Sequence, residues 1–409
     1  MAARGGDAAA SYDAPALPPS IAALRDRRQE AVPISSAERE ARLERARELM
    51  QQARLAAICM TGGTSLCYFS GVHWWPSERL MALVLPVKGQ PFAVCPAFEE
   101  DRLHEQFALI PSLAATRLLT WQEDDDPYAR LAAGLRDLGL TSGAIGVDET
   151  TPFVFAQGIG HALPQATVRS ATPVTAGCRE IKSPAELALM QLANSVTLQV
   201  YEAAWRAAAP GITTHEFSAL VAAAYGRVGF PGDASCETGP YSALPHGSIQ
   251  PQTIREGGMV LIDDGCTIEG YQSDISRSFV YGKPSDKMMQ CFDIVHRAQA
   301  AALAAARPGA TCGSVDAAAR KVIEDTGFGP GYKYFLHRVG HGIGMDMHEW
   351  PYLVRGNAQI IAVHMTFSDE PGIYIPGEFG LRLEDDMFVT EDGARLFTGP
   401  SPSLEHPFG

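Results

Sequence analysis

The sequence predicts an α/β domain followed by an α+β domain in which one structural plan occurs twice. Strand-like and helical stretches alternate in the first part of the chain, which is typical of layered α/β domains. In the second part, two segments each carry an apolar run that ends on carboxylates, and each segment follows a predicted helix. A chain of 409 residues exceeds one comfortable hydrophobic core, so two domains are expected.

The N-terminal segment, residues 1–33, is predicted to be a flexible arm. It has no unbroken apolar stretch of the kind found in signal peptides, and no run elsewhere reaches membrane-spanning length. Ser35 and Glu38 have the spacing of a capping box, which predicts that the first helix begins there. Residues 34–180 are then predicted to form the α/β domain. Its glycines lack the spacing of a nucleotide-binding loop and indicate ordinary turns.

The boundary between the two predicted domains lies near residues 180 and 181. A second capping box, Ser183 to Glu186, has proline at the first helical position, and it predicts a long helix that ends at Pro210-Gly211. The second domain, residues 181–409, contains an apparent internal repeat. Pro210 to Gly229 and Pro308 to Gly327 each span 19 residues (229−210 and 327−308). A carboxylate-bearing strand pair follows each copy, so we expect two α+β halves that close around one site.

The carboxylates at the ends of these strands predict a metal site. Met259–Ile262 ends on Asp263, and the following run carries Asp274; later in the chain, two similar runs carry Glu370 and Glu384. Acidic side chains at the ends of apolar strands are costly unless a cation meets them, and Arg277 is the only one nearby. A single acidic turn is usually a solvated loop. Two such clusters with a histidine-containing, glycine-rich bend between them favour the hard divalent cations of two-metal hydrolases.

Charge and cysteine content exclude some classes of function. The net charge of −14 disfavours a polyanionic partner such as nucleic acid. The eight cysteines have no CxxC spacing, so neither a zinc knuckle nor a disulfide framework is indicated, and a reducing cytoplasm fits best. No membrane partner is expected.

Six short motifs give the chain a specific resemblance. They are LIDDG, GYQSDISRS, HRVGHGIG, HEWP, DEPGIY and GLRLEDD. Together they resemble the pita-bread metallopeptidases, which include prolidase (Xaa-Pro dipeptidase), aminopeptidase P and methionine aminopeptidase, and the resemblance is closest to the Xaa-Pro dipeptidases. The resemblance implies a creatinase-type N-terminal domain and a duplicated, pseudo-two-fold pita-bread catalytic domain.

The resemblance also implies a set of metal ligands and two divalent cations. Carboxylate-rich ligation with one histidine favours Mn(II), with Co(II) or Zn(II) as alternatives. By the resemblance, Asp274 and Glu384 bridge the two ions, and Glu370 also takes up the proton of the attacking water. The implied ligands are Asp263, Asp274, His341, Glu370 and Glu384.

Further residues are expected to act on the substrate. A lone histidine is usually a surface residue, but His246 and His348 match histidines that contact substrate or stabilise the tetrahedral intermediate in the family. Arg382 lies two residues before Glu384, so on a strand both face the same side. The expected catalytic residues are His246, His348, Glu370 and Arg382. The expected substrate-binding residues are His246, His337, His348 and Arg355, the last as the receptor for a substrate carboxylate, with a solvated loop arginine as an equal alternative.

These features lead to one expected reaction and several alternatives. The expected reaction is hydrolysis of Xaa-Pro imide bonds in dipeptides by metal-bound hydroxide. The alternatives are an aminopeptidase P that acts on longer Xaa-Pro peptides, a creatinase-like C–N hydrolase and a sulfonium lyase of the same fold. The presence of all five implied ligands disfavours creatinase-like relatives and non-enzymatic binding modules. The family also implies a homodimer. For Trp74 and Trp75, core packing is the default, and the alternative is that one of them lines the site of the neighbouring subunit.

Overall fold

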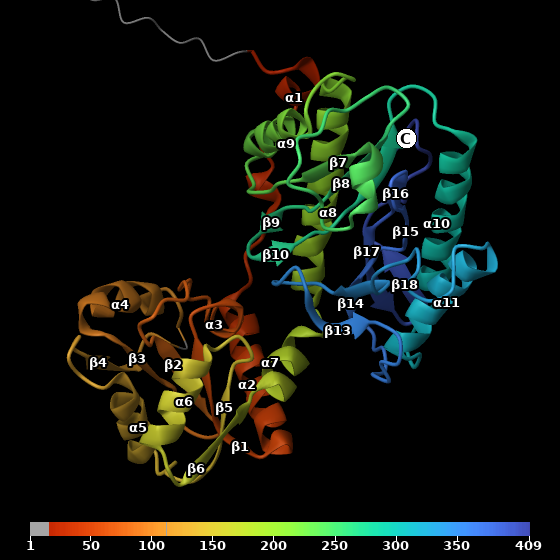
Figure 1. Cartoon of the computed structure of the whole chain (residues 1–409). Helices are drawn as coiled ribbons and strands as arrows, with labels where there is room; N and C mark the ends of the chain where they lie inside the picture. Colours follow the sequence, from red (N-terminus) through yellow and green to blue (C-terminus); the bar gives the residue numbers. More distant parts are fainter. Residues whose placement is uncertain (1–15, 112) are drawn as a thin grey trace, which may run out of the picture.

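The computed structural model describes residues 16–111 and 113–409. Figure 1 shows two units, one N-terminal and one C-terminal, joined near helix α7 (Thr172–Arg179) and the start of α8 (Pro184–Ala207). Ser183 caps α8 with both hydrogen bonds of a capping box. No described helix has the length and apolar character needed to cross a membrane.

The N-terminal unit is a six-stranded mixed sheet with helices on both faces. The strand order is β4-β3-β2-β1-β5-β6, in which β2 runs antiparallel to β1 and β3 and the other pairs are parallel. Hydrophobic cores on the two sides of the sheet bury alternate residues of β1, such as Ile58 and Cys59. The α/β prediction for this region is therefore confirmed. The strands are β1 (Leu55–Thr61), β2 (Ala82–Pro86), β3 (Phe92–Pro96), β4 (Arg117–Trp121), β5 (Gly143–Val147) and β6 (Ala166–Ser170).

Two helices of this unit begin at capping side chains. Ser35 accepts a hydrogen bond from the Glu38 amide at the start of α2, and Asp126 does the same for Tyr128 at the start of α5. The helices are α2 (Ser36–Ala53), α3 (Thr64–Ser70), α4 (Glu100–Ala108), α5 (Pro127–Asp137) and α6 (Phe153–Ala162), with a short 3-10 turn η2 (Ala97–Glu99). A further 3-10 turn, η1 (Arg28–Glu30), precedes this unit.

The C-terminal unit repeats one plan, as predicted. In each half, two helices precede a group of antiparallel strands, and each helix pair packs in its own hydrophobic core. Figure 1 shows the two helix pairs on opposite sides of the strands. The first half contains α8, α9 (Thr214–Val228), η3 (Gly239–Ala243) and a three-stranded sheet of order β11-β8-β7; the second contains α10 (Asp286–Ala305), α11 (Cys312–Asp325) and a five-stranded sheet of order β13-β12-β14-β17-β18.

Short hairpins complete the strands of both halves. The strands of the first half are β7 (Ser235–Thr238), β8 (Met259–Asp263), β9 (Thr267–Ile268), β10 (Tyr271–Gln272) and β11 (Arg277–Val280). Those of the second half are β12 (Gly340–Gly342), β13 (Glu349–Leu353), β14 (Thr366–Asp369), β15 (Gly372–Ile375), β16 (Phe379–Arg382), β17 (Asp385–Thr390) and β18 (Gly393–Leu396).

The described part of the predicted N-terminal arm is packed on the C-terminal unit. Its short helix α1 (Pro19–Ala22) contributes Ile21 and Leu24 to the core formed by α8 and α9. The Ser20 hydroxyl donates a hydrogen bond to the Ala203 carbonyl at 2.8 Å. Burial of these apolar side chains holds residues 16–33 in place, whereas residues 1–15 lie outside the described residues.

Candidate metal centre

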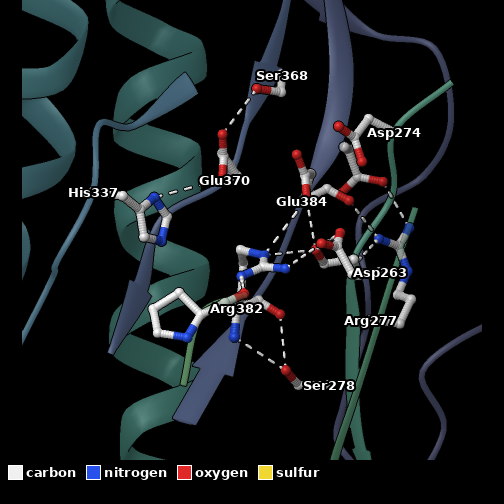
Figure 2. A network of polar contacts seen from close by, with 12 residues as sticks. Asp263, Asp274, Arg277, Ser278, His337, Ser368, Glu370, Arg382 and Glu384 are labelled. Atoms are coloured by element: carbon white, nitrogen blue, oxygen red, sulfur yellow. Dashed lines mark hydrogen bonds and ion pairs between the residues drawn. The ribbon is translucent and has the colours of Figure 1, made fainter. Parts of the chain in front are cut away.

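The fold brings together the five residues expected to bind metal. They come from the ends or links of strands in both halves: Asp263 ends β8, Asp274 lies between β10 and β11, His341 lies in β12, Glu370 follows β14 and Glu384 lies between β16 and β17. Figure 2 shows four of them converging from these strands. Together with His348, their ligand atoms form overlapping groups within 4.8 Å: Asp263–Asp274–Glu384, His341–Glu370–Glu384 and Asp274–His341–His348.

Strand register explains this convergence. Asp369 and Asp385 are paired on β14 and β17, so Glu370 and Glu384 stand next to the last pair of the ladder. On the other half, Ile262 pairs with Arg277, which places Ser276 beside Asp263. Because side chains alternate along a strand, these neighbours point into the space between the two halves.

The Ser276 hydroxyl lies between two of the candidate carboxylates. Its hydroxyl lies 2.6 Å from Asp263 Oδ1 and 2.6 Å from Glu384 Oε2. It also accepts a hydrogen bond from Arg382 Nε at 2.7 Å. A serine has one proton and can donate to only one of the two carboxylates, so this hydroxyl cannot satisfy both of them.

The carboxylates also disfavour one another's ionisation. Burial, followed by the charge of Asp263, raises the pKa of Asp274 well above its usual range. Burial and Asp274 do the same for the pKa of Glu384. Burial opposes ionisation of Asp263 as well, but the guanidinium of Arg382 and hydrogen bonds to the carboxylate, such as that from Ser276, together lower its pKa. Arg382 alone cannot neutralise the group, and divalent cations suit such a set of oxygen donors.

His341 presents a lone pair to the same point. Its Nδ1 lies 3.1 Å from the Gly342 carbonyl, which can only accept, so Nδ1 carries the proton. Nε2 then faces Asp274 Oδ2 at 3.6 Å and Glu370 Oε1 at 3.4 Å. Burial, with a smaller contribution from His348, lowers the pKa of His341 to about 3, so the ring is neutral. A neutral imidazole whose other nitrogen is held by a carbonyl is typical of a metal ligand.

His337 joins Glu370 to a second network, part of which is drawn in Figure 2. Arg382 donates from Nη1 to the Tyr374 hydroxyl at 3.0 Å, so that hydroxyl is free to donate to His337 Nε2 at 2.7 Å. His337 Nδ1 then carries the proton, which it shares with the Arg338 carbonyl at 2.8 Å; Glu370 Oε2 lies 3.5 Å away. Tyr374 therefore fixes the orientation of His337 beside a candidate ligand.

The remaining predicted residues lie at different distances from the centre. His246 is exposed and lines a cavity of about 190 Å³ together with Asp263 and Arg382. The His348 ring is 3.9 Å from that of His341 and lines a separate cavity of about 150 Å³ between the two units. Arg355 is exposed, and its guanidinium carbon lies 5.4 Å above the ring of Tyr332. No described contact joins Arg355 to the five candidate ligands.

Two residues around the candidate ligands were not identified from the sequence, and the expected counter-charge lies elsewhere. Ser276 follows Asp274 by two positions, so the period-two pattern of a strand would have placed both on one side. Tyr374 carries no local signal for its role, because its partners His337 and Arg382 come from other segments of the fold. Arg277, the expected counter-charge, donates to Asp385 Oδ1 at 2.6 Å. Arg382 is instead the arginine that pairs with a candidate ligand, Asp263.

Known proteins resemble both units of the chain. Residues 188–391 match metallopeptidase family M24, and residues 42–181 match the creatinase/prolidase N-terminal domain. The probable dipeptidase PepE of Mycobacterium tuberculosis (strain ATCC 25618 / H37Rv) is 37% identical over 364 residues, which cover 86% of this chain and 92% of that protein. The Xaa-Pro dipeptidase of Lactobacillus delbrueckii subsp. lactis is 30% identical over 371 residues, covering 89% and 98%.

A solved structure supports the same relationship. The crystal structure of dipeptidase PepE from Mycobacterium ulcerans aligns with a TM-score of 0.84 and 35% identity, over 91% of this chain and 99% of that one. The chain belongs to metallopeptidase family M24, with a creatinase/prolidase N-terminal domain and a pita-bread catalytic fold, and it is a metal-dependent peptidase.

Proposed function

We propose that the chain is an Xaa-Pro dipeptidase that uses two divalent cations. The observation that carries the two-cation part is the overlap of the candidate ligand groups, in which Glu384, Asp274 and His341 each belong to two of three groups. A carboxylate shared by two groups has the two oxygens needed to bridge neighbouring cations. The names of the PepE dipeptidases and of the Lactobacillus Xaa-Pro dipeptidase support the substrate class.

Two of the groups would each hold one cation. Asp263, Asp274 and Glu384 would hold the first, and His341, Glu370 and Glu384 would hold the second. Oxygen-rich ligation with one imidazole favours Mn(II), with Co(II) or Zn(II) also suited to it. When bound, such cations lower the pKa of a water towards neutrality and polarise the scissile carbonyl.

The chain's own residues would orient the substrate and handle its protons. Burial raises the pKa of Glu370 to about 7 before any cation is added, so this carboxyl is suited to accept and release a proton near neutral pH. Glu370 Oε2 is kept near His337, and Arg382 holds Asp263 in place. His348, beside His341, is positioned to donate a hydrogen bond to an oxyanion, and exposed His246 is positioned to contact the substrate.

The proposal extends to the physical form of the enzyme. We expect small peptide substrates and a homodimer. We also expect a cytoplasmic location, because all eight cysteines are free and seven of them are buried. The domain limits that we propose are residues 34–180 and 181–409.

The test combines metal content with substrate choice. Metal-free protein is titrated with Mn(II), and we expect two equivalents to bind per chain. The loaded protein should then hydrolyse Ala-Pro faster than Ala-Ala and faster than Ala-Pro-Ala. Preference for Ala-Pro-Ala would instead identify an aminopeptidase P, and cleavage of neither proline peptide would refute the proposal.

A further inference from the structure

Arg338 lies beside the candidate metal centre. It directly follows His337 and precedes strand β12, which carries His341. Its guanidinium carbon lies 4.3 Å from the centre of the Tyr352 ring. Tyr352 is the register partner of His341 on the neighbouring strand β13. Directly paired residues of an antiparallel ladder project on the same side of the sheet, so Arg338 stands one aromatic ring away from His341.

The charge of Arg338 has no carboxylate partner among residues 16–111 and 113–409. Three buried arginines of the same unit each pair with an aspartate: Arg277 with Asp385, Arg320 with Asp316 and Arg382 with Asp263. No comparable ion pair or side-chain hydrogen bond of Arg338 is found in the described structure, although the residue is half-buried. A guanidinium stacked on an aromatic ring keeps its N–H edge available for a planar anion.

The backbone of Arg338 also lies beside the candidate centre. Its carbonyl lies 2.8 Å from His337 Nδ1, and Glu370 Oε2 lies 3.5 Å from the same nitrogen. Arg338 is therefore held next to one candidate ligand by its backbone, while its guanidinium lies over the register partner of another, His341. An anion bound by this guanidinium would lie close to the candidate ligands. The guanidinium of the exposed Arg355 makes no described contact with these residues.

We propose that Arg338 is the specificity-determining residue that binds the free α-carboxylate of the substrate's C-terminal residue. This inference rests on the proposed dipeptidase function. In a dipeptide the carboxylate carbon is three bonds from the scissile carbonyl carbon, about 4 Å at most in an extended chain. Its receptor must therefore be close to the metal centre, as Arg338 is. A longer peptide or an amide offers a neutral group at that place and gains little from the cation.

The experiment compares Ala-Pro with its amide, Ala-Pro-NH₂, in the manganese-loaded full chain. For Arg338→Ala, the ratio of kcat/KM on the dipeptide to kcat/KM on the amide should fall about ten- to a hundredfold, as expected for loss of a charge-assisted hydrogen bond. Arg338→Lys keeps the positive charge but loses the paired N–H donors of the guanidinium, so its ratio should fall less. Inhibition by L-proline, but not by L-prolinamide, should weaken in the same order. Arg395→Ala, at an exposed position on β18, is the control and should leave the ratio unchanged.

The outcomes separate this inference from the proposed function. A wild-type enzyme that cleaves Ala-Pro, together with an unchanged ratio in both Arg338 variants, would overturn the role of Arg338 and leave the dipeptidase proposal standing. A falling ratio in Arg355→Ala alone would transfer the role to Arg355. If the wild type cleaves neither substrate, the proposed function and this inference are both wrong. Should Arg338→Ala fail to fold, the lysine variant and the proline inhibition decide.

Discussion

Two fully buried tyrosines offer a matched test of the network behind the metal centre. The Tyr374 hydroxyl contacts His337 Nε2 at 2.7 Å and Arg382 Nη1 at 3.0 Å. The Tyr201 hydroxyl is equally buried but has no hydrogen-bond partner among the described residues. Replacing each tyrosine by phenylalanine removes one oxygen and keeps the ring. The two variants therefore differ mainly in whether the lost hydroxyl was bonded.

The magnitudes follow from the partners that remain. In Tyr374→Phe, Arg382 Nη1 still reaches the Pro245 carbonyl at 3.2 Å, but His337 Nε2 loses its partner. One unsatisfied buried polar atom costs about 1–3 kcal/mol, so the free energy of unfolding should fall by that amount. Tyr201→Phe removes a buried hydroxyl that makes no bond, so it should leave stability unchanged or raise it by about 1–3 kcal/mol.

Urea denaturation of both variants measures these changes, and steady-state kinetics tests the link to function. Because Tyr374 orients His337 beside Glu370, Tyr374→Phe should lower kcat about tenfold, equivalent to about 1.4 kcal/mol, with little change in KM. Tyr201→Phe should leave both constants unchanged. The reasoning fails if Tyr374→Phe matches the wild type in stability and kcat, or if Tyr201→Phe loses as much stability as Tyr374→Phe.

Three further predictions concern the metals, the pH dependence and the N-terminal unit. Asp274→Ala should bind fewer than two metal ions per chain, measured by elemental analysis, with nearly all activity lost; two bound ions and full turnover would contradict the ligand assignment. The pKa of Glu370 is raised from 4.5 to about 7 in the folded metal-free protein, so the unfolded state binds fewer protons and stability is lost as pH rises between these values. The Tm gap between manganese-loaded and chelated protein should therefore widen from pH 5 to pH 7.5, and a constant gap would argue against this account. Trp75 is 85% exposed and Trp74 is only 8% exposed. If a partner subunit uses Trp75 to line its site, Trp75→Ala should raise KM at unchanged Tm, whereas Trp74→Ala should lower Tm because it leaves a cavity. An unchanged KM in Trp75→Ala would show that Trp75 is not part of the site.

Local sequence signals were sufficient for much of the fold. Capping groups act within one helical turn, so Ser35 and Ser183 mark the starts of α2 and α8 without tertiary information. The candidate ligands could likewise be found because a carboxylate after an apolar run conflicts with burial unless a cation is present. Packing of residues 16–33 was not predictable in this way, because Ile21 and Leu24 gain their burial only from α8 and α9.

The side chains around the ligands depend on strand register, which distance along the chain does not reveal. Tyr374 reaches His337 and Arg382 because β15 and β16 form a hairpin beside the loop that precedes β12. The two arginines near His348 show the same effect. Arg355 follows the HEWP motif by only four residues, yet it lies beyond the end of β13 and is exposed. Arg338 is further from His348 in sequence, but the pairing of His341 with Tyr352 places its guanidinium next to the metal-facing side of the sheet. A cation that binds the substrate carboxylate must lie close to the candidate metal ligands. Strand register therefore favours Arg338, whereas distance along the chain from the HEWP motif favours Arg355.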